Sequence, residues 1–137
     1  MTGMDGFGQQ VKIDKWMKNL EDDMRLIVPF IEDRNVTDIA IGINGELIVK
    51  GFGMGKKFTG IFFDDQTTTR IIYATAAVLG VTIDPHNPIV EGVLPKWKVR
   101  IEGILPPRAA RNPMYFIRRP PAKIFSIESY LDAGRIT

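Results

Sequence analysis

The chain has 137 residues, of which 45% are hydrophobic and 25% charged, enough for one globular domain with a modest core. The absence of cysteine excludes disulfides and thiolate metal sites, and a single histidine, His86, excludes a cluster of imidazole ligands. A formal net charge of +2 does not by itself indicate nucleic-acid binding.

The first predicted element is a helix from about Asp14 to Val28. Asp14 could cap its start, and Pro29 should kink or break it, because proline lacks the backbone donor that continues a helix. We expect residues 1–35 to form a helical segment that packs on the rest of the domain. The apolar residues that recur at helical spacing are Trp16, Leu20, Met24, Ile27, Val28 and Ile31.

A β-hairpin is predicted next, around the dipeptide Asn44-Gly45. This dipeptide favours a two-residue type I′ turn, in which both central residues need positive φ. The residues on either side alternate between apolar and smaller or polar types, which is strand periodicity. The apolar positions of this alternation are Ile39, Ile41, Ile43, Leu47 and Val49.

The glycine-rich stretch GFGMGKKFTG, residues 51–60, superficially resembles a phosphate-binding loop. Such a loop needs glycine at position 50 and serine or threonine at position 57, where the chain has Lys50 and Lys57. A helix should follow it, whereas residues 57–62 have the pattern of a strand. The stretch is therefore predicted to be a flexible loop between two strands, without a phosphate site.

The remaining elements give the fold class. A helix over residues 65–79 is predicted with Asp64 or Asp65 as its cap and Gly80 as its stop. Strands follow near residues 89–94, 98–105 and 114–118, and a short helix is expected at 126–134. The prediction is an α+β fold: a mostly antiparallel sheet of about six strands with helices packed on one face, and the N-terminal helix first.

The C-terminal third of the chain is basic. Residues 91–123 have only Glu91 and Glu102 against eight basic residues, and this leaves two interpretations open, a solvated basic face or an anion site for phosphate. No catalytic constellation is recognisable, and His86, between two prolines, is expected in a loop. No apolar run is long enough for a membrane span, and the start lacks a secretory pattern, so a cytoplasmic location is expected. The basic residues are Lys96, Lys98, Arg100, Arg108, Arg111, Arg118, Arg119 and Lys123.

Several segments together resemble one family. In order, they are VTDIAIGINGELIV, PIVEGVLP, RIEGILPP and FIRRPPAKIFSIESYLDAGRIT. They resemble the N-terminal domain of the traffic ATPases of type IV secretion and conjugal plasmid transfer, most closely its conjugal-transfer branch. The resemblance covers residues 36–137, which we expect to form the N-terminal α+β domain of a secretion ATPase.

The resemblance implies an assembly. Members form hexameric rings, and ATP with Mg²⁺ lies between the N-terminal domain and a P-loop domain of the same subunit. The P-loop is expected beyond Thr137, so this domain alone should bind no cofactor tightly and hydrolyse no ATP. Other type IV secretion components are expected partners, with a cytoplasmic location peripheral to the inner membrane and no direct nucleic-acid binding by this domain.

The resemblance also assigns phosphate-contacting residues. Arg100 in VRIEGILPP and Arg118 in FIRRPP match arginines that reach the terminal phosphate of the nucleotide. A guanidinium group suits this role because it stays charged and presents a rigid fork of donors. For each arginine the alternative is a surface salt bridge, worth about 0–1 kcal/mol.

Three further expectations remain. Arg119, on the opposite strand face from Arg118, should be solvent-exposed or lie at a subunit boundary. Trp97 should pack either at a subunit interface or partly in the core. The competing function is a stand-alone basic binding or adaptor domain with no ATPase activity.

Overall fold

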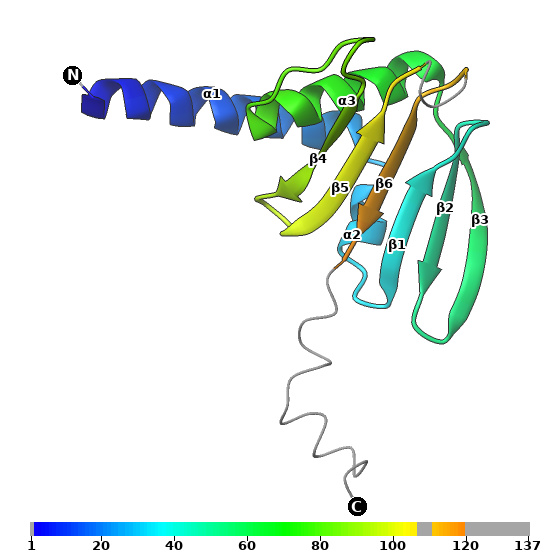
Figure 1. Cartoon of the computed structure of the whole chain (residues 1–137). Helices are drawn as coiled ribbons and strands as arrows, with labels where there is room; N and C mark the ends of the chain where they lie inside the picture. Colours follow the sequence, from blue (N-terminus) through cyan, green and yellow to red (C-terminus); the bar gives the residue numbers. More distant parts are fainter. Residues whose placement is uncertain (1, 107–110, 120–137) are drawn as a thin grey trace, which may run out of the picture.

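The computed structural model describes the backbone of residues 2–106 and 111–119, and side chains from residue 12 onward in these ranges. It contains one sheet with helices on one side (Figure 1). In chain order the elements are α1 (Thr2–Asp23), α2 (Val28–Ile31), β1 (Val36–Ile41), β2 (Glu46–Gly51), β3 (Met54–Phe62), α3 (Asp65–Leu79), β4 (Ile89–Leu94), β5 (Val99–Ile104) and β6 (Met114–Arg118).

The six strands have the order β3-β2-β1-β6-β5-β4, and every neighbouring pair is antiparallel. The fold class predicted from the sequence is thereby confirmed. The connection from β3 through α3 to β4 carries the chain from one edge of the sheet to the other (Figure 1). As a consequence β6 returns to the middle of the sheet, between β1 and β5.

Strand alternation directs one set of side chains toward the helices. Both Ile101 and Ile117 are buried on this face, whereas Arg100 and Arg118, one residue away, are exposed on the other. The helix α3 approaches closely because Gly103 has no side chain: a Cβ there would lie 3.1 Å from atoms of Ile72 and Val90. The described helices thus cover one face of the sheet, and none of them lies on the opposite face, here called the helix-free face (Figure 1).

One buried hydrogen bond joins α3 to β6. The hydroxyl groups of Thr75 and Tyr115 lie 2.7 Å apart, and Thr75 Oγ1 donates to the carbonyl of Ile71 at 2.8 Å. Tyr115 is therefore the donor to Thr75. Burial raises the pKa of the Tyr115 phenol. The polar atoms that these residues bring into the core are thus satisfied within it.

The N-terminal helix is longer than predicted. It begins at Thr2, so the prediction that Asp14 caps its start is wrong, because Asp14 lies in the helix interior. The prediction that the helix runs to Val28 and is interrupted by Pro29 is wrong: α1 ends at Asp23, residues 24–27 form turns, and Pro29 lies in the first turn of α2, where its missing donor costs nothing. Both segments contribute to the core, α1 through Leu20 and α2 through Ile31.

The first hairpin differs from the predicted turn. The amide of Gly42 donates to the carbonyl of Glu46, and the amide of Gly45 to that of Gly42, so three residues, 43–45, lie between the hydrogen-bonded Gly42 and Glu46. Gly45 has φ +84°, but Asn44 does not have positive φ, and the type I′ prediction is wrong. Ile43, predicted in the strand, lies in this connection and is exposed.

The glycine-rich stretch is mostly strand. A turn at Phe52 and Gly53 joins β2 to β3, and β3 begins at Met54, three residues earlier than predicted. The predicted loop is therefore limited to Phe52 and Gly53, because the other residues of the stretch belong to β2 or β3. A strand follows the turn, whereas a phosphate loop needs a helix there. The predicted helix at residues 65–79 is confirmed, with Asp64 accepting from the Thr67 amide at 2.7 Å and Gly80 in the left-handed conformation. The helix predicted at 126–134 lies outside the described residues.

Candidate functional site

The helix-free face of the sheet carries a row of charged residues across four strands. Asp38 on β1 is paired in register with Lys50 on β2 and with Arg118 on β6. Arg118 is paired in turn with Arg100 on β5. Because cross-strand partners point to the same side of a sheet, the two arginines predicted to contact phosphate lie next to each other on one face.

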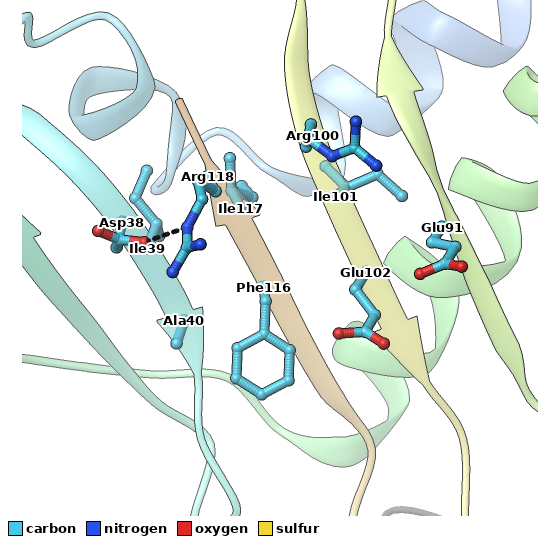
Figure 2. A pocket seen from close by; sticks show the side chains of 10 residues that line it. All are labelled: Asp38, Ile39, Ala40, Glu91, Arg100, Ile101, Glu102, Phe116, Ile117 and Arg118. Carbon is cyan, nitrogen blue, oxygen red and sulfur yellow. Dashed lines mark hydrogen bonds and ion pairs between the residues drawn. The ribbon is translucent and has the colours of Figure 1, made fainter. Parts of the chain in front are cut away.

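Arg118 has a carboxylate partner within this row. Its Nε donates to Asp38 Oδ1 at 3.0 Å, and Figure 2 shows the guanidinium turned toward Asp38 on β1. The other carboxylate oxygen of Asp38 accepts from the Thr37 hydroxyl at 2.9 Å. The Arg118 side chain is 76% exposed and that of Asp38 35%, so the carboxylate is the better-fixed member of the pair.

Arg100 faces Arg118 without a carboxylate between them. Among the described residues it makes no ion pair of 4 Å or less. Like charges directly opposite each other on neighbouring strands destabilise a sheet, so this pairing has no benefit for the isolated fold. Two adjacent guanidinium groups do form a favourable site for a multiply charged anion.

Both arginines line an open cleft of about 380 Å³ (Figure 2). Three carboxylates share it, those of Asp38, Glu91 and Glu102, against the two guanidinium groups. An aromatic side chain, Phe116, lies on the same face of β6 as Arg118, next to Ala40 of β1. The cleft therefore has a basic part near Arg100 and Arg118 and an acidic part near Glu91 and Glu102.

The described residues indicate which ligands this cleft could hold. They contain no group of three or more histidine, cysteine, aspartate or glutamate residues arranged to bind a metal ion. The two guanidinium groups can donate to the oxygens of an anion such as a phosphate or a carboxylate. Within the same ranges of the chain, no helix has both the length and the apolar composition needed to cross a membrane.

Two other sequence predictions concern residues near this region. Arg119 is half-buried, so the exposed alternative predicted for it is wrong, and its place at a subunit boundary stays a prediction. Its backbone amide donates to the Thr37 carbonyl at 2.9 Å, and its buried Nε has no partner among the described residues. Trp97 is also half-buried and packs against the core, with Lys96 Nζ 5.5 Å from its ring centroid. Of the two positions predicted for Trp97, packing in the core is therefore observed, and packing at a subunit interface stays a prediction.

The sequence did not identify the carboxylates and the aromatic residue of the cleft. Asp38 lies in a strand where alternation places it on the outer face, but nothing local indicates that β6 is its neighbour. Phe116 lies two residues before Arg118 in β6 and therefore on the same face of the strand, but this alternation alone indicates no role for it. The signal that could have found both residues is the order of the strands in the sheet.

Two proteins with similar sequences are both described as conjugal transfer proteins. No protein-family model matches the chain. It is 30% identical over 107 residues to a protein described as a probable conjugal transfer protein TrbB of Sinorhizobium fredii, and 27% identical over 107 residues to the conjugal transfer protein TrbB of Rhizobium radiobacter. Each match covers 78% of this chain and 32% of the relative, so the chain spans about a third of the length of these relatives.

A solved structure has the same fold. The VirB11 ATPase of the Brucella suis type IV secretion system, in complex with sulphate, matches with a TM-score of 0.74. The match covers 89% of this chain and 36% of that chain, at 19% sequence identity. At this level of identity the likeness concerns the fold alone.

Proposed function

We infer that the chain is the N-terminal domain of a traffic ATPase of the type IV secretion and conjugal-transfer family, an inference supported by the sequence resemblance and by the similarity to two conjugal transfer proteins. In the whole protein this domain would cover an ATP molecule held by a P-loop domain. Repeated ATP turnover would then power conjugal transfer or secretion by a hexameric ring at the cytoplasmic side of the inner membrane. The whole protein's activity, ring and location are parts of this proposal.

The observation that supports the proposal is the register of β5 and β6. It places Arg100 and Arg118 directly opposite each other on the helix-free face, where both line one cleft. An ATP phosphate between them would be neutralised by two positive charges, and it would offset the repulsion that the arginines otherwise exert on each other. The role proposed for these residues is to bind the terminal phosphate and stabilise the charge that develops on it during transfer.

Mg²⁺ and most phosphate contacts are assigned to the P-loop domain. The cleft has guanidinium donors that fit phosphate oxygens, but its described carboxylates form no metal-binding group. When bound, Mg²⁺ would neutralise charge on the β- and γ-phosphates. This chain would orient the terminal phosphate and supply positive charge to one side of it. The position of the domain would then depend on whether ATP or ADP is bound.

Nucleotide binding tests this assignment. In the full-length protein, Arg100→Gln is expected to weaken ATP binding about tenfold and to leave ADP binding unchanged, because only ATP has the terminal phosphate that Arg100 would contact. Equilibrium titration of both nucleotides measures the difference. Lys98→Gln is a matched control, since it removes a neighbouring exposed positive charge at the β4–β5 turn. A loss of ATP affinity equal to the loss of ADP affinity, or no loss at all, would contradict the role of Arg100.

A further inference from the structure

The pair formed by Arg118 and Asp38 suggests a second role within the cleft. Among the described residues, Arg118 makes one ion pair, in which its Nε lies 3.0 Å from Asp38 Oδ1, and the guanidinium is turned toward β1 (Figure 2). Arg100 lies on the other side of β6, on β5. A phosphate that both arginines contact would therefore draw Arg118 from Asp38 toward Arg100.

Asp38 is suited to be the fixed partner in such an exchange. Its second oxygen is held by the Thr37 hydroxyl at 2.9 Å, and Thr37 Oγ1 also lies 3.3 Å from the carbonyl of Lys50 on β2. Arg118 is the long, largely exposed member, and an exposed ion pair of this kind is weak. A phosphate group, with more negative charge and more acceptor oxygens than a carboxylate, can therefore displace Asp38.

The charges around the Arg118–Asp38 pair indicate whether Asp38 strengthens or weakens phosphate binding in the cleft. Asp38, Glu91 and Glu102 give the cleft three negative charges against two positive ones. Asp38 is the carboxylate that touches an arginine, so it competes with a phosphate for Arg118 and also repels it. Without a phosphate, Asp38 neutralises Arg118 and reduces the repulsion between Arg118 and Arg100.

We propose that Asp38 is a positioning residue that holds Arg118 away from the nucleotide until a terminal phosphate replaces it. This inference rests on the proposed function, because it assumes that Arg118 contacts the phosphate. Arg118 would then have two partners, Asp38 in the ADP-bound or empty state and the phosphate in the ATP-bound state. The carboxylate would lower the affinity for ATP and would make the position of β1 sensitive to the bound nucleotide.

The test is the affinity of the full-length protein for adenosine 5′-(γ-thio)triphosphate, a slowly hydrolysed ATP analogue. Asp38→Asn keeps the shape of the side chain and removes its charge, and it is expected to tighten binding of the analogue by up to about fivefold. The gain should vanish in an Arg118→Ala background, because the competition needs Arg118. Glu102→Gln, which removes the same charge from the same cleft without touching Arg118, should give a smaller gain.

The possible outcomes distinguish competition for Arg118 from other roles of Asp38 and from a failure of the proposed phosphate contact. A gain from Asp38→Asn that persists without Arg118, or that Glu102→Gln equals, would show general electrostatics in the cleft and overturn the competition. Weaker binding by Asp38→Asn would make Asp38 a support for bound Arg118 and would also overturn it. If Arg118→Ala by itself leaves affinity for the analogue unchanged, the phosphate contact proposed for Arg118 fails first, and the role of Asp38 fails with it. A thermal unfolding midpoint equal to that of the unmodified protein confirms that each variant is folded.

Discussion

Replacing Arg118 with alanine in the full-length protein is expected to lower the rate of ATP hydrolysis by about 10³-fold, the low end of what a phosphate-contacting arginine contributes to phosphoryl transfer. The physical reason is that Arg118 lines the cleft opposite Arg100. Its largely exposed guanidinium can donate to the phosphate as charge develops on it, which alanine cannot do. Steady-state turnover at saturating ATP and Mg²⁺ measures the effect.

The chain offers a matched control for this variant. Arg70 on α3 is also exposed and is also paired with an aspartate, at 3.4 Å from Asp23, but it belongs to the helical layer. Arg70→Ala should leave turnover unchanged, and both variants should unfold at nearly the same temperature as the unmodified protein, since exposed ion pairs contribute little. Equal turnover for Arg118→Ala and the unmodified protein would remove Arg118 from the reaction.

Gly45→Ala is expected to destabilise the chain by about 3–5 kcal/mol, the upper range for a single substitution. Gly45 has φ +84°, where a residue with a side chain loses about 1–2 kcal/mol. A Cβ at this position would also lie 2.2 Å from the carbonyl oxygen of Phe63, so the backbone would have to move. The Gly45 carbonyl accepts the Phe63 amide at 2.8 Å, and this bond, which joins the first hairpin to the end of β3, would be strained or lost.

Two glycines of the glycine-rich stretch serve as controls that separate the effect of positive φ from the effect of the contact with Phe63. Gly53 also has positive φ, +68°, but a Cβ there would meet nothing within 4 Å, so Gly53→Ala should lose only about 1–2 kcal/mol. Gly55 lies in open space without positive φ, and Gly55→Ala should change stability by less than about 1 kcal/mol. Urea unfolding of the three variants measures this order. Equal losses at 45 and 53 would show that the contact with Phe63 has no effect of its own.

The parts of the fold that depend on neighbours in the chain were predictable. The helix α3 has its N-cap, Asp64, and its left-handed stop, Gly80, within the segment itself, and both were identified. Alternation along β5 is sufficient to place Arg100 and Glu102 on one face of the strand, opposite the buried Val99 and Ile101. The turn at Asn44-Gly45 was predicted wrongly because this dipeptide fits both a two-residue turn and a three-residue connection in which glycine alone has positive φ.

The arrangement of the cleft depends on contacts between distant segments. Alternation assigns each strand two faces, but it does not say whether the face of β5 with Arg100 and the face of β6 with Arg118 are the same face of the sheet. That result follows from the pairing of β5 with β6. The role inferred for Asp38 depends on a still longer connection, since β1 and β6 pair across 80 residues between Asp38 and Arg118.

A structure of the full-length protein with a non-hydrolysable ATP analogue and Mg²⁺ tests the central claim most directly. The account predicts guanidinium nitrogens of Arg100 and Arg118 at about 2.7–3.0 Å from oxygens of the terminal phosphate, with Arg118 no longer on Asp38. A nucleotide bound in the P-loop domain with both arginines turned to solvent, or a different surface of this domain facing it, would contradict the account.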